Sequence, residues 1–144
     1  MQTIKVMQVL LLTILFWTPL AAQENAIGVW QTIDDETGEA KSHIQIFEKD
    51  GKLYGKVIKL LQADPGKLCD QCPGDKKDQP ILGMQVLSDL QPYRDYWSYG
   101  RILDPQNGKT YKCSIWLEDA DHLKVRGYIG VSALGRSQDW YRVK

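Results

Sequence analysis

The sequence lacks the net charge, the histidines and the motifs that mark several common functions. Among its 144 residues, 18 lysines and arginines balance 18 aspartates and glutamates. Because both signs are spread along the chain, no overall field attracts nucleic acid or an anionic membrane. Only two histidines are present, and neither a Gly-x-Ser-x-Gly motif nor a phosphate-binding loop occurs. Enzymatic activity is therefore unsupported, and we expect no catalytic residues and no cofactor.

Long apolar runs are also missing, except for one near the N-terminus. Lys5 precedes an apolar run over residues 6–17, which small residues follow as far as Ala22. The run is about 12 residues long, short of the roughly 20 that span a bilayer. This layout is typical of a secretory signal peptide. We therefore expect residues 1–22 to be removed and residues 23–144 to form one exported domain, periplasmic or secreted. A membrane anchor is the alternative.

Long helical periodicity is absent, and short alternating runs separated by turn residues take its place. We predict strands over residues 27–33, 42–48, 53–61, 96–103, 109–118, 122–130 and 138–143. Residues 80–90 are ambiguous between a short strand and a helical turn lying under the sheet, and residues 90–95 are interpreted as a loop. With about eight strands, the chain fits a closed antiparallel up-and-down β-barrel that holds side chains or one small ligand.

Aromatic residues mark both ends of the predicted domain. Gly28-Val29-Trp30 opens the first strand, and the last strand carries Trp140 and Arg142. If the sheet closes, these strands become neighbours and Arg142 can stack on the ring of Trp30. Such a cation–π pair contributes roughly 0.5–2 kcal/mol. We expect Gly28, Trp30 and Arg142 to close the barrel.

The Gly28-x-Trp30 and Arg142 pair resembles the signature of calycins, the superfamily of lipocalins and fatty-acid-binding proteins. The whole predicted domain resembles a bacterial exported family, DUF2147, which is itself thought to be calycin-like. The matching stretches are Gly28-Val29-Trp30, Asp50-Gly51-Lys52-Leu53-Tyr54-Gly55, Cys69-Asp70-Gln71-Cys72, Pro80-Ile81-Leu82-Gly83, Asp104-Pro105, Gly108-Lys109, Val125-Arg126-Gly127-Tyr128-Ile129-Gly130, Leu134-Gly135-Arg136, Trp140 and Arg142. The resemblance implies a lipocalin-like barrel and export, and it carries no established activity.

Three cysteines are present, and two of them form a Cys69-x-x-Cys72 motif within an irregular stretch at residues 62–79. A thioredoxin-like site would need a helix to begin at the first cysteine, but Pro73-Gly74 follows. In an oxidising compartment, a local disulfide that pins this long loop fits better. A metal site is the other alternative, although zinc needs two more ligands and no motif spacing supplies them. Cys113 is predicted to be a buried free thiol.

Candidate ligand contacts come from the later strands, where the aromatic residues are mostly Trp and Tyr. Such residues suit a cavity wall that is partly apolar and partly hydrogen-bonding. The candidates are Tyr111, Arg126, Tyr128, Arg136 and Trp140. Tyr111 shares a strand face with Ile115 and Leu117, whereas Arg126 and Tyr128 would point to solvent if Val125 points inward. The inward wall is predicted to contain Ile44, Ile46, Val57, Ile115, Leu117, Leu123 and Val125.

We therefore expect an exported protein that binds a small hydrophobic or amphipathic molecule in or at the mouth of the barrel. The alternative is an interaction or structural module, in which side chains fill the barrel and the loop bearing Cys69 and Cys72 contacts an envelope partner. The sequence does not indicate an oligomeric state.

Overall fold

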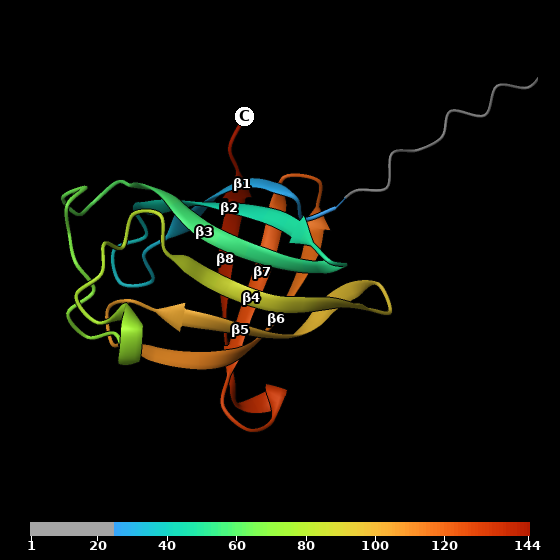
Figure 1. Ribbon diagram of the computed structural model, residues 1–144. Coiled ribbons are helices and arrows are strands. Elements are labelled where there is room, and N and C mark those ends of the chain that lie inside the picture. Colours follow the sequence, from blue (N-terminus) through green and yellow to red (C-terminus); the bar gives the residue numbers. More distant parts are fainter. Residues whose placement is uncertain (1–24) are drawn as a thin grey trace, which may run out of the picture.

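In the computed structural model, residues 25–144 form a closed barrel of eight antiparallel strands (Figure 1). The strands are β1 (Gly28–Ile33), β2 (Ala40–Lys49), β3 (Lys52–Leu60), β4 (Gln85–Tyr93), β5 (Tyr96–Asp104), β6 (Lys109–Asp119), β7 (His122–Tyr128) and β8 (Arg136–Arg142). Two short 3₁₀ helices, η1 (Gly74–Lys76) and η2 (Ser132–Leu134), lie in connections. The predicted fold class is confirmed. The signal peptide expected at residues 1–22 lies outside the described residues.

Each strand pairs with the next, and β1 closes the barrel by pairing with β8 through Trp30 opposite Arg142 and Gln31 opposite Tyr141. Alternation sends every second side chain inward. At the end of the barrel where β1 begins, the interior is filled by fully buried Trp30, Ile46, Leu90, Ile115 and Leu123. This end is therefore closed by the protein's own side chains.

The segment interpreted as a loop at residues 90–95 is instead mostly strand, and that interpretation was wrong. β4 continues to Tyr93, and a turn at Arg94 leads into β5. Asp89 has a φ of 60° inside β4, so strict alternation fails and the two fully buried leucines, Leu87 and Leu90, are three residues apart. Such an irregularity makes the strand difficult to predict from the sequence, because inward-facing side chains no longer occur at every second residue.

Inward-facing Leu90 packs directly against the backbone of β5. A Cβ atom on Gly100 would lie 2.5 Å from Cδ2 of Leu90 and 2.9 Å from the carbonyl oxygen of Ser88. Only glycine leaves enough room for this contact. The pair of β4 and β5 thereby helps to fill the interior between the closed end and the middle of the barrel.

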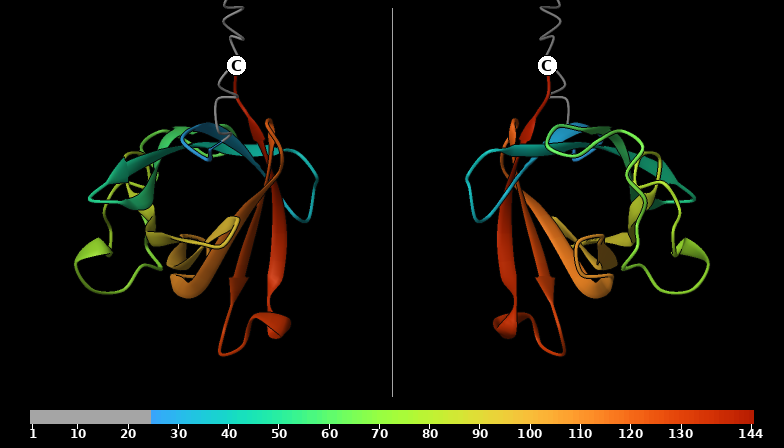
Figure 2. Two further views of the ribbon diagram at one scale, coloured as in Figure 1. Left: turned by 90° about the vertical axis from the view of Figure 1, so that its right-hand side faces the viewer. Right: turned by 90° about the vertical axis from the view of Figure 1, so that its left-hand side faces the viewer.

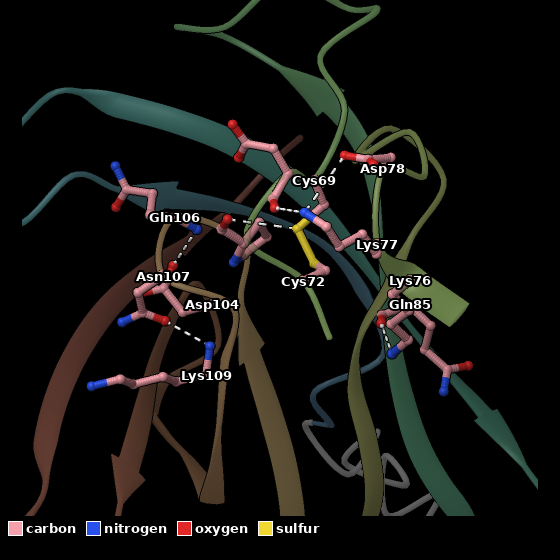
Figure 3. The surroundings of a disulfide bond; sticks show 12 residues. Cys69, Cys72, Lys76, Lys77, Asp78, Gln85, Asp104, Gln106, Asn107 and Lys109 are labelled. Atoms are coloured by element: carbon pink, nitrogen blue, oxygen red, sulfur yellow. Dashed lines mark hydrogen bonds and ion pairs between the residues drawn. A yellow bond between two sulfur atoms is a disulfide. The ribbon is translucent and has the colours of Figure 1, made fainter. Parts of the chain in front are cut away.

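The long connection between β3 and β4 is ordered by its own hydrogen bonds. The amide of Cys69 donates to the carbonyl of Gln79, and that of Ile81 donates to Lys67, around an isolated bridge between Leu68 and Pro80. The predicted disulfide between Cys69 and Cys72 is confirmed (Figure 3). Both half-cystines are buried, with exposed fractions of 0% and 2%. The bond is therefore a structural part of this connection.

The disulfide segment lies against the turn between β5 and β6. Sγ of Cys69 is 3.6 Å from the carbonyl oxygen of Pro105. Gly108 has a φ of 69°, and a Cβ atom there would lie 1.6 Å from the carbonyl oxygen of Gln71. Glycine is thus needed at position 108 for both its conformation and its size. The two connections form one packed unit on the same end of the barrel.

Cys113 is a free thiol and fully buried, as predicted. Burial raises the pKa of this thiol to about 12, because the interior disfavours the thiolate.

None of the helices within residues 25–144 is long and apolar enough to cross a membrane.

Candidate functional site

The barrel contains a cavity of about 570 Å³ at the end opposite the filled interior. The connections that gather at this end are β1–β2, β3–β4, β5–β6 and β7–β8, as the alternation of strand directions requires. Figure 2 shows these connections from two sides of the barrel. The cavity walls come from strands on every side of the barrel. We call this end the mouth.

The inner part of the cavity is apolar. Its wall includes the buried side chains of Ile44, Val57, Leu103, Val125 and Trp140. The rim at the mouth is charged and carries both signs: Asp34, Asp35, Glu36, Lys41, Lys67, Asp104 and Arg136. An apolar interior with a polar entrance suits a molecule with one apolar and one polar end.

A pair of hydroxyl groups interrupts the apolar wall. Thr32 Oγ1 and Ser42 Oγ are 2.8 Å apart, and Thr32 Oγ1 also lies 3.4 Å from the carbonyl oxygen of Ser42. Both residues line the cavity and are almost fully buried. Since a hydroxyl group can donate one hydrogen bond and accept more, this pair can also bind a polar atom within the cavity.

A chain of hydrogen bonds connects the cavity wall with the rim on the β1–β8 side. Trp140 Nε1 donates to Gln138 Oε1 over 3.2 Å, and Gln138 Nε2 donates to Asp35 Oδ2 over 2.9 Å. The same oxygen is 2.9 Å from Nη2 of Arg136. The β1–β2 connection is thereby held against the start of β8.

A second contact crosses the mouth. Lys41 Nζ, at the start of β2, donates to Gln106 Oε1 in the β5–β6 turn over 2.8 Å. Since β2 and β5 are separated by two strands in one direction around the barrel and four in the other, this bond joins different sides of the mouth. Exposed side chains form it, so it can open at little cost.

Most acidic groups at the rim already have partners in the protein. Asp34 accepts hydrogen bonds from the amides of Glu36 and Thr37, and these bonds lower the pKa of its carboxyl group. Asp104 accepts from the amide of Gln106. Asp35 is occupied by Gln138 and Arg136. These carboxylates therefore shape the connections around the mouth.

Three of the five predicted ligand contacts line the cavity: Tyr111, Arg136 and Trp140. The hydroxyl of Tyr111 accepts a hydrogen bond from Asn107 Nδ2 over 3.0 Å. The remaining two, Arg126 and Tyr128, are not among the lining residues. Since Val125 and Gly127 face the cavity, alternation turns both side chains to the outer face, where Arg126 Nη1 donates to Ser137 Oγ. They are therefore placed away from the cavity.

The predicted apolar wall divides between the cavity and the filled interior. Ile44, Val57 and Val125 line the cavity, whereas Ile46, Ile115 and Leu123 are buried without lining it. Leu117 is partly buried against the core.

Three lining residues were not predicted from the sequence: Thr32, Ser42 and Gln138. Each lies two positions along its strand from a residue whose side chain points inward, namely Trp30, Ile44 and Trp140 respectively. Alternation from those residues would have found them.

The closed end contains the expected contact between the first and last strands. The Arg142 guanidinium lies 4.3 Å from the ring centroid of fully buried Trp30. Trp30 Nε1 donates to the carbonyl of Ala26 over 2.8 Å.

Among the residues from 25 onward, no group of three or more histidines, cysteines or carboxylates comes together that could hold a metal ion.

Comparison with known proteins agrees with this architecture. Residues 28–142 match a family described as "Uncharacterized protein conserved in bacteria", DUF2147. A solved structure of protein HP1028 from Helicobacter pylori, described as belonging to the lipocalin family, superposes with a TM-score of 0.74. The two are 23% identical over 83% of this chain and 84% of that chain. No curated protein matches the sequence. The structural similarity shows a common fold.

Proposed function

The chain belongs to the bacterial family DUF2147, and we propose that it is an exported carrier that binds one small amphipathic molecule in the open half of its barrel. The cavity is the observation that carries this proposal. Its volume of about 570 Å³ lies within the range of roughly 300–1,000 Å³ that is usual for small-molecule sites. The lipocalin-like fold of the structural neighbour supports the same class of function.

The arrangement of the cavity favours one orientation of the ligand. The apolar portion would pack on Val125, Ile44 and Trp140 in the inner half. The polar end would lie where Tyr111 and the Thr32–Ser42 pair offer hydroxyl groups, or at the charged rim. Burial of apolar surface provides most of the affinity, at about 25 cal/mol per Å², and the hydroxyl groups provide selectivity.

Export is part of the proposal and has two supports. The first is the leader-like sequence at residues 1–22, with its apolar run at 6–17. The second is the buried Cys69–Cys72 disulfide, since such bonds persist mainly in oxidising compartments.

The alternative, an interaction or structural module, draws on a different observation. Side chains fill the closed half of the barrel, and the β3–β4 connection beside the mouth is ordered by its own hydrogen bonds and the Cys69–Cys72 disulfide. Under this alternative the cavity would be incidental and no apolar probe would bind saturably.

Gly127 provides a direct test because it lines the cavity without a side chain. A Cβ atom there would lie 3.5 Å from Ile102 Cγ2 and Tyr111 Cβ, an ordinary contact. Gly127→Leu should therefore fill part of the cavity while the barrel still folds. The matched control is Tyr128→Leu on the same strand, since Tyr128 does not line the cavity.

We expect an anilinonaphthalene sulfonate probe and a fluorescent fatty acid to bind the natural protein saturably with micromolar affinity, about 8 kcal/mol. Gly127→Leu should weaken both by at least about tenfold, or 1.4 kcal/mol, while Tyr128→Leu should leave them unchanged. Thermal unfolding of each variant checks that the barrel is intact. Absence of saturable binding to the folded natural protein would favour the interaction module instead.

A further inference from the structure

The connection between β7 and β8 carries the most exposed aliphatic side chains among the described residues. Ile129, Val131 and Leu134 have exposed fractions of 68%, 62% and 77%. All three lie within six positions of one another, around the short helix η2. In Figures 1 and 2 this orange connection projects beyond the rest of the barrel. We call Ile129, Val131 and Leu134 the apolar tip.

Cationic side chains lie on the outer face of the barrel beside the apolar tip. Arg101 on β5 is directly opposite Lys112 on β6, and Lys112 is opposite Tyr128 at the end of β7. Lys112 Nζ also donates to the carbonyl of Gly130 over 3.3 Å, so its charge is at the base of the tip. Like charges placed opposite each other destabilise a sheet, and an anionic surface would relieve that repulsion.

Carboxylates are absent from two chain segments that contribute to this region. The sequence contains no Asp or Glu between Lys109 and Leu117, and none between Arg126 and Gln138. Asp35 approaches from the β1–β2 connection, where it pairs with Arg136. Although the whole chain is electrically balanced and the rim of the mouth carries both signs, the outer face beside the tip carries the cationic pair Arg101 and Lys112. Its charge is complementary to an anionic surface.

We infer that the apolar tip, together with Arg101 and Lys112, docks the barrel on an anionic lipid bilayer. Three aliphatic side chains on a protruding connection can insert into the interfacial region of a membrane, where apolar groups are buried by about 5–10 Å. A protein partner would need about 800 Å² on this side alone, which three side chains do not supply. Nearby cations strengthen binding to anionic lipid.

Docking in this way would attach the barrel through a connection that leads directly into the rim of the mouth. Arg136 follows the tip and lines the cavity, so the tip and the rim are parts of one continuous segment. The inference goes beyond the proposed ligand binding and does not depend on it, since it can be tested with vesicles and no added ligand.

The test is vesicle flotation of the protein, comparing vesicles of phosphatidylcholine alone with vesicles of phosphatidylcholine and phosphatidylglycerol in equal parts. We expect binding to the anionic vesicles and a loss of that binding at high salt. Val131→Asp combined with Leu134→Asp should reduce partitioning at least tenfold. The control, Ile58→Asp combined with Leu61→Asp, changes the net charge equally at two exposed positions outside the tip and should lose much less.

Arg101→Gln and Lys112→Gln should each reduce binding about fivefold, the effect of one cation near an anionic surface. Equal losses in the tip and control variants would overturn the inference, because they would indicate general charge repulsion. So would a natural protein that binds neither kind of vesicle. If sedimentation shows a dimer that the tip variant abolishes, a second copy of the chain occupies the tip and the membrane proposal is wrong.

Discussion

Arg142 covers the indole ring of Trp30 and, at the same time, connects three separate segments at the closed end of the barrel. Its Nε donates to the carbonyl of Ala120, its Nη1 to that of Ile27 and its Nη2 to that of Asn25, all over 2.8–2.9 Å. The stacking distance is 4.3 Å. One guanidinium at the end of β8 thus joins the residues just before β1 to the β6–β7 turn.

Replacing either member of this pair should destabilise the barrel. Trp30→Ala removes a fully buried indole and should lower the free energy of unfolding by about 3–5 kcal/mol. Arg142→Ala removes three hydrogen bonds and the stacking contact, and should cost about 2–3 kcal/mol. The control is Lys144→Ala, whose exposed ammonium lies 3.1 Å from Asp121 and should cost under about 0.5 kcal/mol. Urea unfolding measures all three, and a loss at Arg142 no larger than at Lys144 would contradict this role.

The cysteines should be distinguishable by counting thiols. Folded protein should react with a thiol reagent very slowly, since Cys113 is fully buried and burial raises its pKa. Denatured protein should show one thiol, and denatured and reduced protein should show all three. Replacing Cys69 and Cys72 by Ser should cost about 2 kcal/mol, as expected for a disulfide that closes a very short loop. Three thiols in unreduced, denatured protein would exclude the disulfide.

Gly108→Ala should separate the β5–β6 turn from the disulfide segment. The new methyl group would collide with the carbonyl of Gln71, and φ at this position is positive. The matched control is Gly74→Ala in the β3–β4 connection, where φ is 61° but a Cβ atom meets nothing within 4 Å. Gly74→Ala should cost about 1 kcal/mol, from backbone strain alone, and Gly108→Ala about 3 kcal/mol or more. Amide exchange at residues 68–83 should accelerate only in the Gly108 variant, and equal behaviour would refute the packing argument.

Stability should fall at acidic pH in a way that depends on Asp139. Hydrogen bonds from Lys124 and then from His122 lower the pKa of Asp139 below its ordinary value of 3.8. Because the unfolded chain takes up the proton at a higher pH, this carboxylate stabilises the fold above about pH 4, and the contribution is lost as pH falls through the folded pKa. Asp139→Asn should therefore show a shallower decline in melting temperature below pH 4 than the natural protein. Parallel curves would exclude this contribution.

The same ion pair predicts an effect at alkaline pH. The hydrogen bond to Asp139 raises the pKa of Lys124 above its ordinary value of 10.5. The stabilisation is complete below that value and is lost as pH rises through the higher folded pKa. Lys124→Gln should flatten the alkaline decline and the acidic decline together, since it removes one side of the pair. Thermal melts across both pH ranges provide the measurement.

Tyr111→Phe should discriminate between kinds of ligand. The hydroxyl of Tyr111 lies at the cavity wall within 3.0 Å of Asn107 Nδ2. Its loss should weaken a ligand with a polar end by roughly 1 kcal/mol and leave a pure hydrocarbon probe nearly unaffected. Competition binding with a fatty acid and with an alkane of similar length tests this. Equal losses of affinity for the two would indicate that the polar end of the ligand does not contact Tyr111.

Much of the barrel was predictable because most of its strands alternate without interruption. Ile44 and Ile46 on β2, or Leu123 and Val125 on β7, point inward as the period of two requires. β4 was not predictable in full, since the positive φ of Asp89 places Leu87 and Leu90 on the same side at a spacing of three. Pro92, near the end of that strand, also reads as a turn residue.

The cavity was predictable only in part. Tyr111, Arg136 and Trp140 could be placed at the wall because they share strand faces with aliphatic residues or lie beside the last turn. How much of the interior stays open depends on which side chains meet between strands, as Leu90 on β4 packs against Gly100 on β5. Such contacts join different strands, and the alternation within one strand does not encode them.

The filled end has a kinetic consequence for any occupant of the cavity. Because Trp30, Ile46, Leu90, Ile115 and Leu123 close the interior behind it, the lumen is a cup with one opening and not a tunnel. Because a cavity of about 570 Å³ is the size that holds one small molecule, an arriving molecule has to wait until the resident one has left through the same opening. Exchange should therefore proceed at a rate set by dissociation, independent of the concentration of the competing molecule.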